Sequence, residues 1–299
     1  MSAEPAPADA GPPAVEGRVG IAGLAGLYAE SVGWLRASPR LRRSLLGWSV
    51  LGLALCAGIS VPVAALVSRP AAAWAALGSV LWSLLVSLVL LGGASMLITP
   101  DGRRLDHYGV PNGLSAVRAY SCLPLILCAT LPLAGDTGLY LWCAIGAPAG
   151  CLDLVDGWVA RRYGPVTELG KALDPLGDAV FFGMAAVGNV LVGILPAWLG
   201  AVILVRFAAP LLATPVVFLM RRRPPLVATE WGRRSTLLCG LVILVCAVVK
   251  LAGGPVQVPA VLLGVPLVVT TTVLHFATLW RRVAEAPVVR PSRRERRQG

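Results

Sequence analysis

Long apolar runs separated by short polar breaks are the dominant pattern of this sequence. A hydrocarbon core of about 30 Å requires roughly 20 apolar residues per helix, and eight runs have a suitable length. They are residues 45–67, 73–98, 114–134, 139–159, 177–195, 197–220, 236–252 and 257–279. The runs are continuously apolar, and backbone groups in lipid must bond within their own segment. The pattern therefore predicts an all-α, polytopic transmembrane helix bundle.

The polar breaks divide the chain into four predicted units. The first two runs contain no charged residue, so we expect them to form an anchoring hairpin. Before them, residues 21–44 predict an interfacial helix with Trp34 as its anchor. The units are a mostly disordered cytoplasmic tail (1–44), an accessory transmembrane hairpin (45–98), a six-span catalytic bundle (99–282) and a basic cytoplasmic tail (283–299).

The chain carries a net charge of +11, and the placement of the basic residues decides what that charge indicates. If the N-terminus is cytoplasmic and each run crosses once, only Arg69 and Lys250 fall on the opposite side. This positive-inside pattern predicts a multi-pass protein of a bacterial-type inner membrane, with both termini cytoplasmic and basic clusters that contact membrane lipid. No basic patch is interleaved with base-stacking aromatics, so no nucleic-acid partner is expected.

Four aspartates at two neighbouring span boundaries are the main chemical feature of the sequence. They are Asp153, Asp156, Asp174 and Asp178. Spacings of three and four residues place each pair on one helix face, and the Gly and Pro between the pairs suit a turn that lets them converge. Four like charges repel unless cations neutralise them. Oxygen-only ligation favours Mg²⁺ or Mn²⁺ over zinc.

Three residues near these aspartates are further candidates. Gly157 and Gly170 lack a Cβ, which leaves room either for a ligand or for close helix packing. Arg161 follows Asp156 by little more than one turn, and its guanidinium can bind a phosphate or balance the carboxylates.

The whole arrangement resembles the motif of the CDP-alcohol phosphotransferase family. Residues 153–178 follow the pattern D-x2-D-G-x2-A-R-x8-G-x3-D-x3-D at every specified position. The resemblance covers about residues 100–282 and leaves the first hairpin outside it. It implies transfer of a phosphatidyl group from CDP-diacylglycerol to an alcohol, with release of CMP, in a homodimeric protein.

The resemblance also implies roles for individual residues at a cytoplasmic active site. Two divalent cations would be held by Asp153, Asp156, Asp174 and Asp178, and Asp178 would also be the catalytic base. The CDP site would be lined by Gly157, Ala160, Arg161 and Gly170. Asn112 and Arg118, in a segment that resembles the family's first span, would reach the donor phosphates. Without the family, Asn112 indicates only a helix start and Arg118 only a snorkelling interfacial residue.

The acceptor is suggested by a second resemblance, to phosphatidylglycerophosphate synthases. It involves Arg206 within a span and the segment that contains Arg233 and Arg234, and it implies glycerol 3-phosphate, which these cations would bind. Two positions depart from that pattern, because Phe207 replaces an acidic residue and Ala179 replaces a lysine. The stretch 181–184 is similar to serine-accepting members. Serine, inositol phosphate and phosphatidylglycerol therefore remain alternative acceptors.

Two interpretations of a different kind are weaker. A multi-span transporter would also carry intramembrane charge, but its carboxylates usually lie near the bilayer midplane on broken helices. The aspartates here cluster at one face beside a basic loop. A catalytically dead scaffold would be expected to have lost part of the motif, whereas all four aspartates are present.

Overall fold

The computed structural model describes residues 21–163, 167–219 and 230–285. Within these ranges the chain is helical and contains no strand, which confirms the all-α prediction. The elements are α1 (Ile21–Ala37), α2 (Pro39–Ala65), α3 (Arg69–Gly92), the 3-10 turn η1 (Ala94–Met96), α4 (Gly109–Tyr120), α5 (Cys122–Thr130), α6 (Thr137–Tyr163), α7 (Glu168–Leu191), α8 (Ala197–Leu219), α9 (Glu230–Leu251), α10 (Gln257–Pro259), the π-helix η2 (Ala260–Val269) and α11 (Thr270–Glu285).

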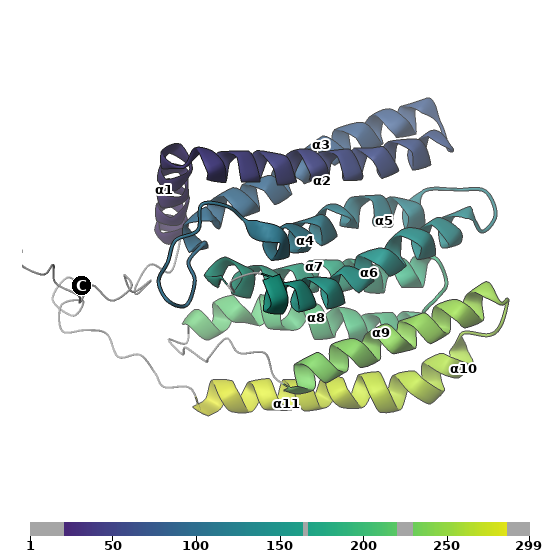
Figure 1. The fold of residues 1–299 in the computed structure, drawn as a ribbon. Helices are drawn as coiled ribbons and strands as arrows, with labels where there is room; N and C mark the ends of the chain where they lie inside the picture. Colours follow the sequence, from purple (N-terminus) through teal and green to yellow (C-terminus); the bar gives the residue numbers. More distant parts are fainter. Residues whose placement is uncertain (1–20, 164–166, 220–229, 286–299) are drawn as a thin grey trace, which may run out of the picture.

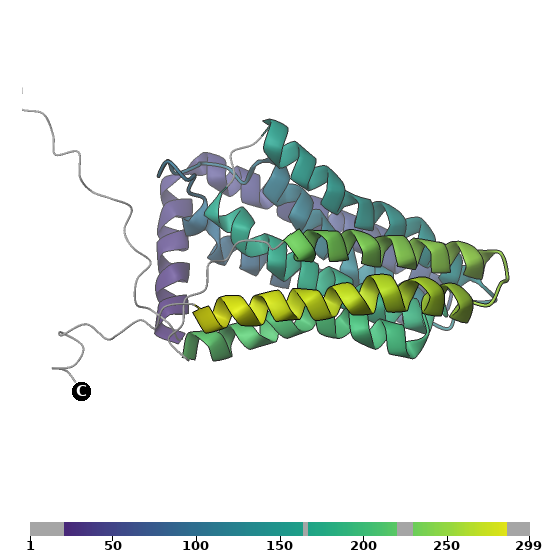
Figure 2. The same cartoon turned by 90° about the horizontal axis from the view of Figure 1, so that it is seen from below.

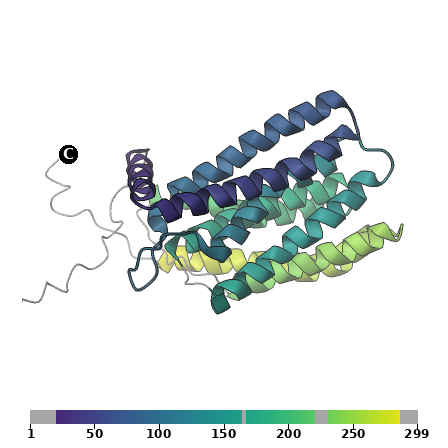
Figure 3. The ribbon, with the colours of Figure 1, turned by 45° about the horizontal axis from the view of Figure 1, so that its top comes forward.

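The long helices lie side by side, and α1 crosses one end of the bundle (Figures 1 and 3). The α2–α3 hairpin forms one side of the molecule and the α9 and α11 helices form the other, with α4 to α8 between them (Figures 1 and 2). Five helical segments in the described ranges are long and apolar enough to cross a membrane. We call the end that α1 crosses the α1 end of the bundle.

Helix α1 is shorter than the predicted interfacial helix. Its last residue is Ala37, because Ser38 adopts an extended backbone and its side chain accepts a hydrogen bond from the Leu41 amide at 3.2 Å. A serine in this position caps a new helix, so residues 39–44 belong to α2 and not to an interfacial segment. Two hydroxyls hold α1 against α3: Tyr28 donates to Leu88 O and Ser31 to Gly92 O.

Both ends of α3 differ from the predicted span 73–98. The helix begins earlier because Ser68 caps it, which puts Pro70 in its first turn, where a missing amide proton costs nothing. It also ends earlier, at Gly92, and the chain then forms η1 and a single antiparallel bridge between Ile98 and Arg104. The apolar run therefore extends past the helix that it predicts.

The predicted span 114–134 is divided between α4 and α5. The two helices are separated by Ser121 alone, whose amide still donates to Val117 O at 3.0 Å and whose hydroxyl donates to Arg118 O at 2.7 Å. Pro124 in the following turn has no amide proton to continue the ladder. Helix α4 carries Arg118, α5 is a short apolar segment, and the two together have the length of one membrane span.

Aromatic side chains join the α2–α3 hairpin to the rest of the bundle. The Trp48 ring of α2 lies directly against Gly113 of α4, and the Tyr120 ring of α4 lies against Gly52 of α2. The Trp82 indole of α3 donates to Ala119 O of α4 at 2.9 Å. The hairpin is therefore packed along α4 over much of its length.

Candidate active site

Helices α6 and α7 carry the two halves of the aspartate motif. The backbone of α6 is helical through Tyr163, and Thr167 caps α7 by accepting a hydrogen bond from the Gly170 amide at 3.0 Å. The turn that the Gly and Pro residues predict falls on residues 164–166, which lie outside the described residues. The side chains of Asp153, Asp156, Gly157, Ala160 and Arg161 lie outside the described residues, so their predicted roles stay untested.

A hydrogen bond between α6 and α7 shows how these two helices are oriented. The Trp142 indole, near the start of α6, donates to Asn189 Oδ1, near the end of α7, at 3.1 Å. Both residues are buried, and the Trp142 ring lies against Gly188. The start of one helix thus meets the end of the other. The helices are antiparallel, and both halves of the motif lie toward the α1 end.

Arg118 and Asp178 form a direct ion pair. The guanidinium of Arg118 on α4 donates from Nη2 to Asp178 Oδ1 on α7 at 3.0 Å. The arginine side chain is 1% exposed, whereas the aspartate side chain is 31% exposed. A buried guanidinium needs a charged or strongly polar partner. The aspartate meets that need and keeps part of its surface open to other groups.

Gly177 lies close beside this ion pair, and the sequence pattern did not single it out. A Cβ built on Gly177 would lie 3.2 Å from Arg118 Nη2, closer than nearly all real Cβ contacts. A side chain at this position would therefore require the guanidinium to shift by a few tenths of an ångström. The available signal was a glycine inside a helix directly before a motif aspartate, a position where glycine is otherwise unfavourable.

Asn112 and Gly170 lie together beside the start of α7. The buried Asn112 amide donates to Tyr108 O at 2.7 Å and to Thr167 Oγ1 at 3.3 Å. A Cβ on Gly170 would lie 3.1 Å from Asn112 Oδ1. These contacts give both residues a packing role at the α7 cap. Their predicted contact with the donor stays a prediction.

Asp174 lies one helical turn before Asp178 and is exposed. Two carboxylates on one helix face, one exposed and one partly so, are oxygen donors suited to a hard divalent cation. Among the described residues, no group of three or more His, Cys, Asp or Glu side chains comes together. The side chains of the other two aspartates lie outside the described residues, and the four-carboxylate site stays a prediction.

The predicted acceptor residues lie on α8 and α9. Arg206 is 3% exposed and donates from Nη2 to Gly232 O at 2.9 Å and to Thr236 Oγ1 at 3.3 Å. Its Nε has no hydrogen-bond partner among the described residues. Arg234 is exposed, with its guanidinium 5.6 Å from the Trp231 ring centroid. The Arg233 side chain lies outside the description.

Residues 108–277 match the family model for CDP-alcohol phosphatidyltransferase. The chain belongs to that family. The matched region begins just before α4 and ends within α11, so α1, α2 and α3 lie outside it. The ion pair between Arg118 and Asp178 lies inside it.

Individual relatives in this family are named for different reactions. A probable phosphatidylglycerophosphate synthase of Mycobacterium tuberculosis is 32% identical over 130 residues, which are 44% of this chain and 60% of the relative. A CMP-forming cardiolipin synthase of Streptomyces coelicolor is 34% identical, over 42% of this chain and 59% of the relative. A CDP-diacylglycerol–glycerol-3-phosphate 3-phosphatidyltransferase of Bacillus subtilis is 36% identical over 26% and 38%. The chain thus spans at most about 60% of these relatives. No solved structure matches the chain.

An aromatic cluster connects the two buried arginines of this CDP-alcohol phosphatidyltransferase family member. The Arg118 guanidinium lies 5.9 Å from the Phe181 ring, which meets Phe182 edge to face. Phe182 in turn stacks on Phe207, with centroids 4.5 Å apart, beside Arg206. Phe207, which departs from the synthase pattern, therefore packs α8 against α7. Ala179, the other departure, is buried.

Proposed function

We propose that this protein transfers a phosphatidyl group from CDP-diacylglycerol to an alcohol and releases CMP. The observation that carries the proposal is the Arg118–Asp178 ion pair, which lies within the matched family region and joins two helices at the motif. It supplies a buried cation and a partly open carboxylate at one place. The cation can bind the donor phosphates, and the carboxylate can accept the proton of the acceptor hydroxyl.

The helix register supports convergence of all four motif aspartates. Trp142 precedes Asp153 by 11 residues, and Asn189 follows Asp178 by 11 residues. At a rise of 1.5 Å per residue, both aspartates lie about 16 Å along their helices from the Trp142–Asn189 hydrogen bond. By the same argument, Asp156 on α6 and Asp174 on α7 lie at nearly equal distances along their helices from that hydrogen bond. The four positions therefore belong to one level of the bundle.

The donor set suits two Mg²⁺ or Mn²⁺ ions, which we propose are held by Asp153, Asp156, Asp174 and Asp178. Carboxylate oxygens are the ligands that these cations take in phosphate-handling sites. When bound, the ions would neutralise the pyrophosphate and the charge that develops on the leaving group.

The residues of this chain would perform the remaining steps. Asp178 would accept the proton of the acceptor hydroxyl, whose oxygen forms a bond to the phosphorus nearest the diacylglycerol. The bond from that phosphorus to the bridging oxygen breaks, and its electron pair leaves with CMP. Arg118 would hold Asp178 in place and lie beside the donor phosphates. Gly157, Ala160, Arg161, Gly170 and Asn112 would line the CDP site, as the family resemblance implies.

Glycerol 3-phosphate is the acceptor that we propose. Two of the relatives have names that specify phosphatidylglycerophosphate synthesis or glycerol 3-phosphate. Arg206 supports the same choice, because a buried guanidinium with an uncommitted N–H is suited to a phosphorylated acceptor. Arg233 and Arg234 directly follow Gly232, whose carbonyl accepts from Arg206, and they would add cationic charge at the same place.

Phosphatidylglycerol is a second candidate acceptor. It is favoured by the similarity to the cardiolipin synthase relative, whose identity over a comparable length is 34%. Serine and inositol phosphate remain within the same chemistry. A neutral zwitterion such as serine has less need of Arg206 than a phosphorylated acceptor has.

The protein is a multi-pass membrane protein, and we propose that the α1 end faces the cytoplasm of a bacterial inner membrane. Basic residues gather at that end, in Arg40, Arg42, Arg43, Arg103 and Arg104. Arg69 and Lys250 stand at the opposite end, at the start of α3 and the end of α9. This bias is the positive-inside signal. A homodimer is expected from the family resemblance.

The decisive experiment measures CMP release by the purified protein in lipid nanodiscs. CDP-dioleoylglycerol and Mg²⁺ are supplied with glycerol 3-phosphate, phosphatidylglycerol, serine, inositol or inositol phosphate in separate reactions. We expect release with glycerol 3-phosphate and loss of release after chelation, restored by Mg²⁺ or Mn²⁺. Release with phosphatidylglycerol alone would replace the acceptor that we propose. No release with any acceptor would refute the proposed function.

A further inference from the structure

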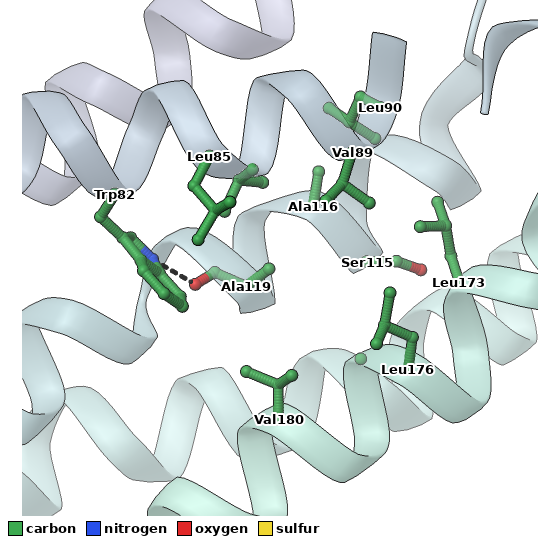
Figure 4. A pocket seen from close by; sticks show the side chains of 12 residues that line it. Trp82, Leu85, Val89, Leu90, Ser115, Ala116, Ala119, Leu173, Leu176 and Val180 are labelled. Atoms are coloured by element: carbon green, nitrogen blue, oxygen red, sulfur yellow. Dashed lines mark hydrogen bonds between the residues drawn. The ribbon is translucent and has the colours of Figure 1, made fainter. Parts of the chain in front are cut away.

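An apolar cavity of about 180 Å³ lies between α3, α4 and α7. Its lining includes Leu85 and Val89 from α3, Ala116 and Ala119 from α4, and Leu176 from α7 (Figure 4). Ser115 is the one hydroxyl among the lining residues, and it donates to its own helix at Pro111 O. The interior therefore offers hydrocarbon surface to any occupant.

The cavity is elongated along the helices. Along α3 its lining runs from Trp82 to Leu90, a rise of about 12 Å at 1.5 Å per residue. Leu90 and Leu173 flank the end nearer the α1 end, and Trp82 closes the other end (Figure 4). The indole is held there by its hydrogen bond to Ala119 O. The length of the cavity is thus limited by a fixed aromatic ring.

One wall of the cavity is shared with the candidate active site. Gly177 lines the cavity and is also the residue over which the Arg118 guanidinium passes. Its neighbour Asp178 accepts from Arg118, and Asp174 lies one turn earlier. Asp174 and Asp178 directly follow the lining residues Leu173 and Gly177, so a molecule whose hydrocarbon part filled the cavity would lie against the helix that carries both carboxylates.

The cavity also opens toward the exterior of the bundle. Leu85 is 51% exposed and Val89 is 37% exposed, although both contribute to the lining. On helices that cross a membrane, exposed apolar side chains face lipid tails. An occupant can therefore enter sideways from the bilayer without passing through water.

We infer that this cavity holds one acyl chain of the diacylglycerol donor, a role that rests on the proposed function. A cavity of about 150 Å³ lined by apolar side chains accommodates benzene, so ~180 Å³ has room for roughly half a dozen methylene groups. The occupied part would be the segment of the chain near the glycerol. This segment would fix the position of the phosphorus relative to Asp178.

The accessory hairpin thereby contributes to the donor site. The family match begins at residue 108, whereas Trp82, Leu85 and Val89 belong to α3, outside it. Lipid tails are as apolar as the cavity, so burial of hydrocarbon supplies little net free energy here. The gain is in positioning, and a misplaced reacting atom lowers the rate even when the lipid still binds.

The first test compares two tryptophan substitutions on the same helix. Val89→Trp fills the mouth of the cavity, whereas Leu84→Trp changes an outward residue that is 54% exposed and does not line it. With CDP-dioleoylglycerol we expect Val89→Trp to lower kcat/KM about tenfold, as hydrophobic pockets discriminate against a poor fit. With a donor carrying four-carbon chains the decrease should be much smaller. Leu84→Trp should match the wild type with both donors.

The second test uses cross-linking and does not depend on turnover. A CDP-diacylglycerol with a diazirine on the fifth acyl carbon is irradiated with the wild-type protein in nanodiscs. We expect adducts on residues 82–90 or 173–180, and their loss in the presence of excess CDP-dioleoylglycerol. A phosphatidylcholine carrying the same group is the control for bulk lipid.

The outcomes separate this inference from the proposed function. If the wild type releases no CMP from either donor, the proposed function fails. If it does release CMP but Val89→Trp behaves as Leu84→Trp with both donors, the acyl-chain site is overturned alone. Equal labelling of the cavity by the phosphatidylcholine probe would assign it to a bilayer lipid and would also overturn the inference.

Discussion

The α2–α3 hairpin and the predicted six-span bundle, α4 to α11, bury different kinds of polar group. We call the second region the six-helix part. In the hairpin the buried polar groups are the hydroxyls of Ser60, Ser79 and Ser83. In the six-helix part they include two arginines, Arg118 and Arg206, each no more than 3% exposed. Hydroxyls join helices within a membrane at low cost, whereas charges there are expensive and are usually functional. The comparison leads us to expect the chemistry in the second region and a supporting role for the first.

The largest effect should follow Asp178→Asn, which tests whether the charges of the six-helix part do the chemistry. The amide can still accept from Arg118 but cannot take a proton from an acceptor hydroxyl, and loss of a general base lowers rates about 10²–10⁴-fold. We expect that decrease in CMP release in a protein that still folds, with a lower midpoint of thermal unfolding because the buried Arg118 loses its charged partner. Asp136→Asn, in the connection at the opposite end, is the control. Near-normal release by Asp178→Asn would assign the base to another group.

Arg206→Gln should have the next largest effect. It tests whether Arg206 serves the acceptor, whereas Arg118 serves the donor. Hydrogen bonds to charged groups contribute about 1.5–3 kcal/mol, which corresponds to a roughly 10- to 100-fold higher KM for glycerol 3-phosphate. The KM for the lipid donor should not change. Acceptor titrations in the CMP assay measure both constants, and Arg69→Gln serves as a control at the far end of the bundle. Partial recovery in Arg206→Lys would separate charge from folding. An unchanged acceptor KM would remove Arg206 from the acceptor site.

A Gly113→Leu substitution tests whether the hairpin is held in place by close packing. The Trp48 ring already fills the space next to Gly113, and forced overpacking costs about 1–3 kcal/mol. We expect a lower midpoint of thermal unfolding in detergent and a loss of donor chain-length preference. Gly58→Leu on α2, where a Cβ meets nothing within 4 Å, is the matched control. Equal stability of the two variants would show that the hairpin is only loosely attached.

The smallest effect is expected for Ser87→Ala, which probes the hydroxyl contacts of the hairpin. Its Oγ lies 2.9 Å from Ser49 Oγ and 3.0 Å from the Tyr120 hydroxyl. Removal of such a bond should cost about 0.5–1.5 kcal/mol, with CMP release unchanged. The control is Ser60→Ala, because the buried Ser60 hydroxyl has no partner among the described residues. A larger loss for Ser60→Ala than for Ser87→Ala would contradict the assignment.

The helices could largely be predicted from the apolar runs, but several of their ends could not. Helix α7 begins at Glu168, well before the predicted span at 177, since Thr167 caps it outside the apolar run. Helix α3 ends at Gly92 although the apolar run continues to residue 98. Hydropathy reports where a chain can contact lipid. Helix ends depend on caps and turns that hydropathy does not detect.

The candidate site could be predicted in part. The motif located Asp174 and Asp178 on one face of α7, because fixed spacing on a helix determines which residues share a face. The sequence also identified Arg118 as a candidate, but as a donor-phosphate or interfacial residue. Its partnership with Asp178 depends on how α4 packs against α7. Gly177, which lies close beside that ion pair, was missed for the same reason.

The sequence by itself determined that this chain is a helical membrane protein with a CDP-alcohol phosphatidyltransferase motif, because apolar length and residue spacing are local properties. Only the tertiary structure decided that α3, outside the family region, forms a wall of a cavity beside Gly177. The sequence predicts an accessory hairpin, and that role stays a prediction; the shared wall leads us to expect that its removal impairs donor positioning. Contacts between residues far apart in the chain depend on the shapes of packed side chains. No local pattern of residues encodes those shapes.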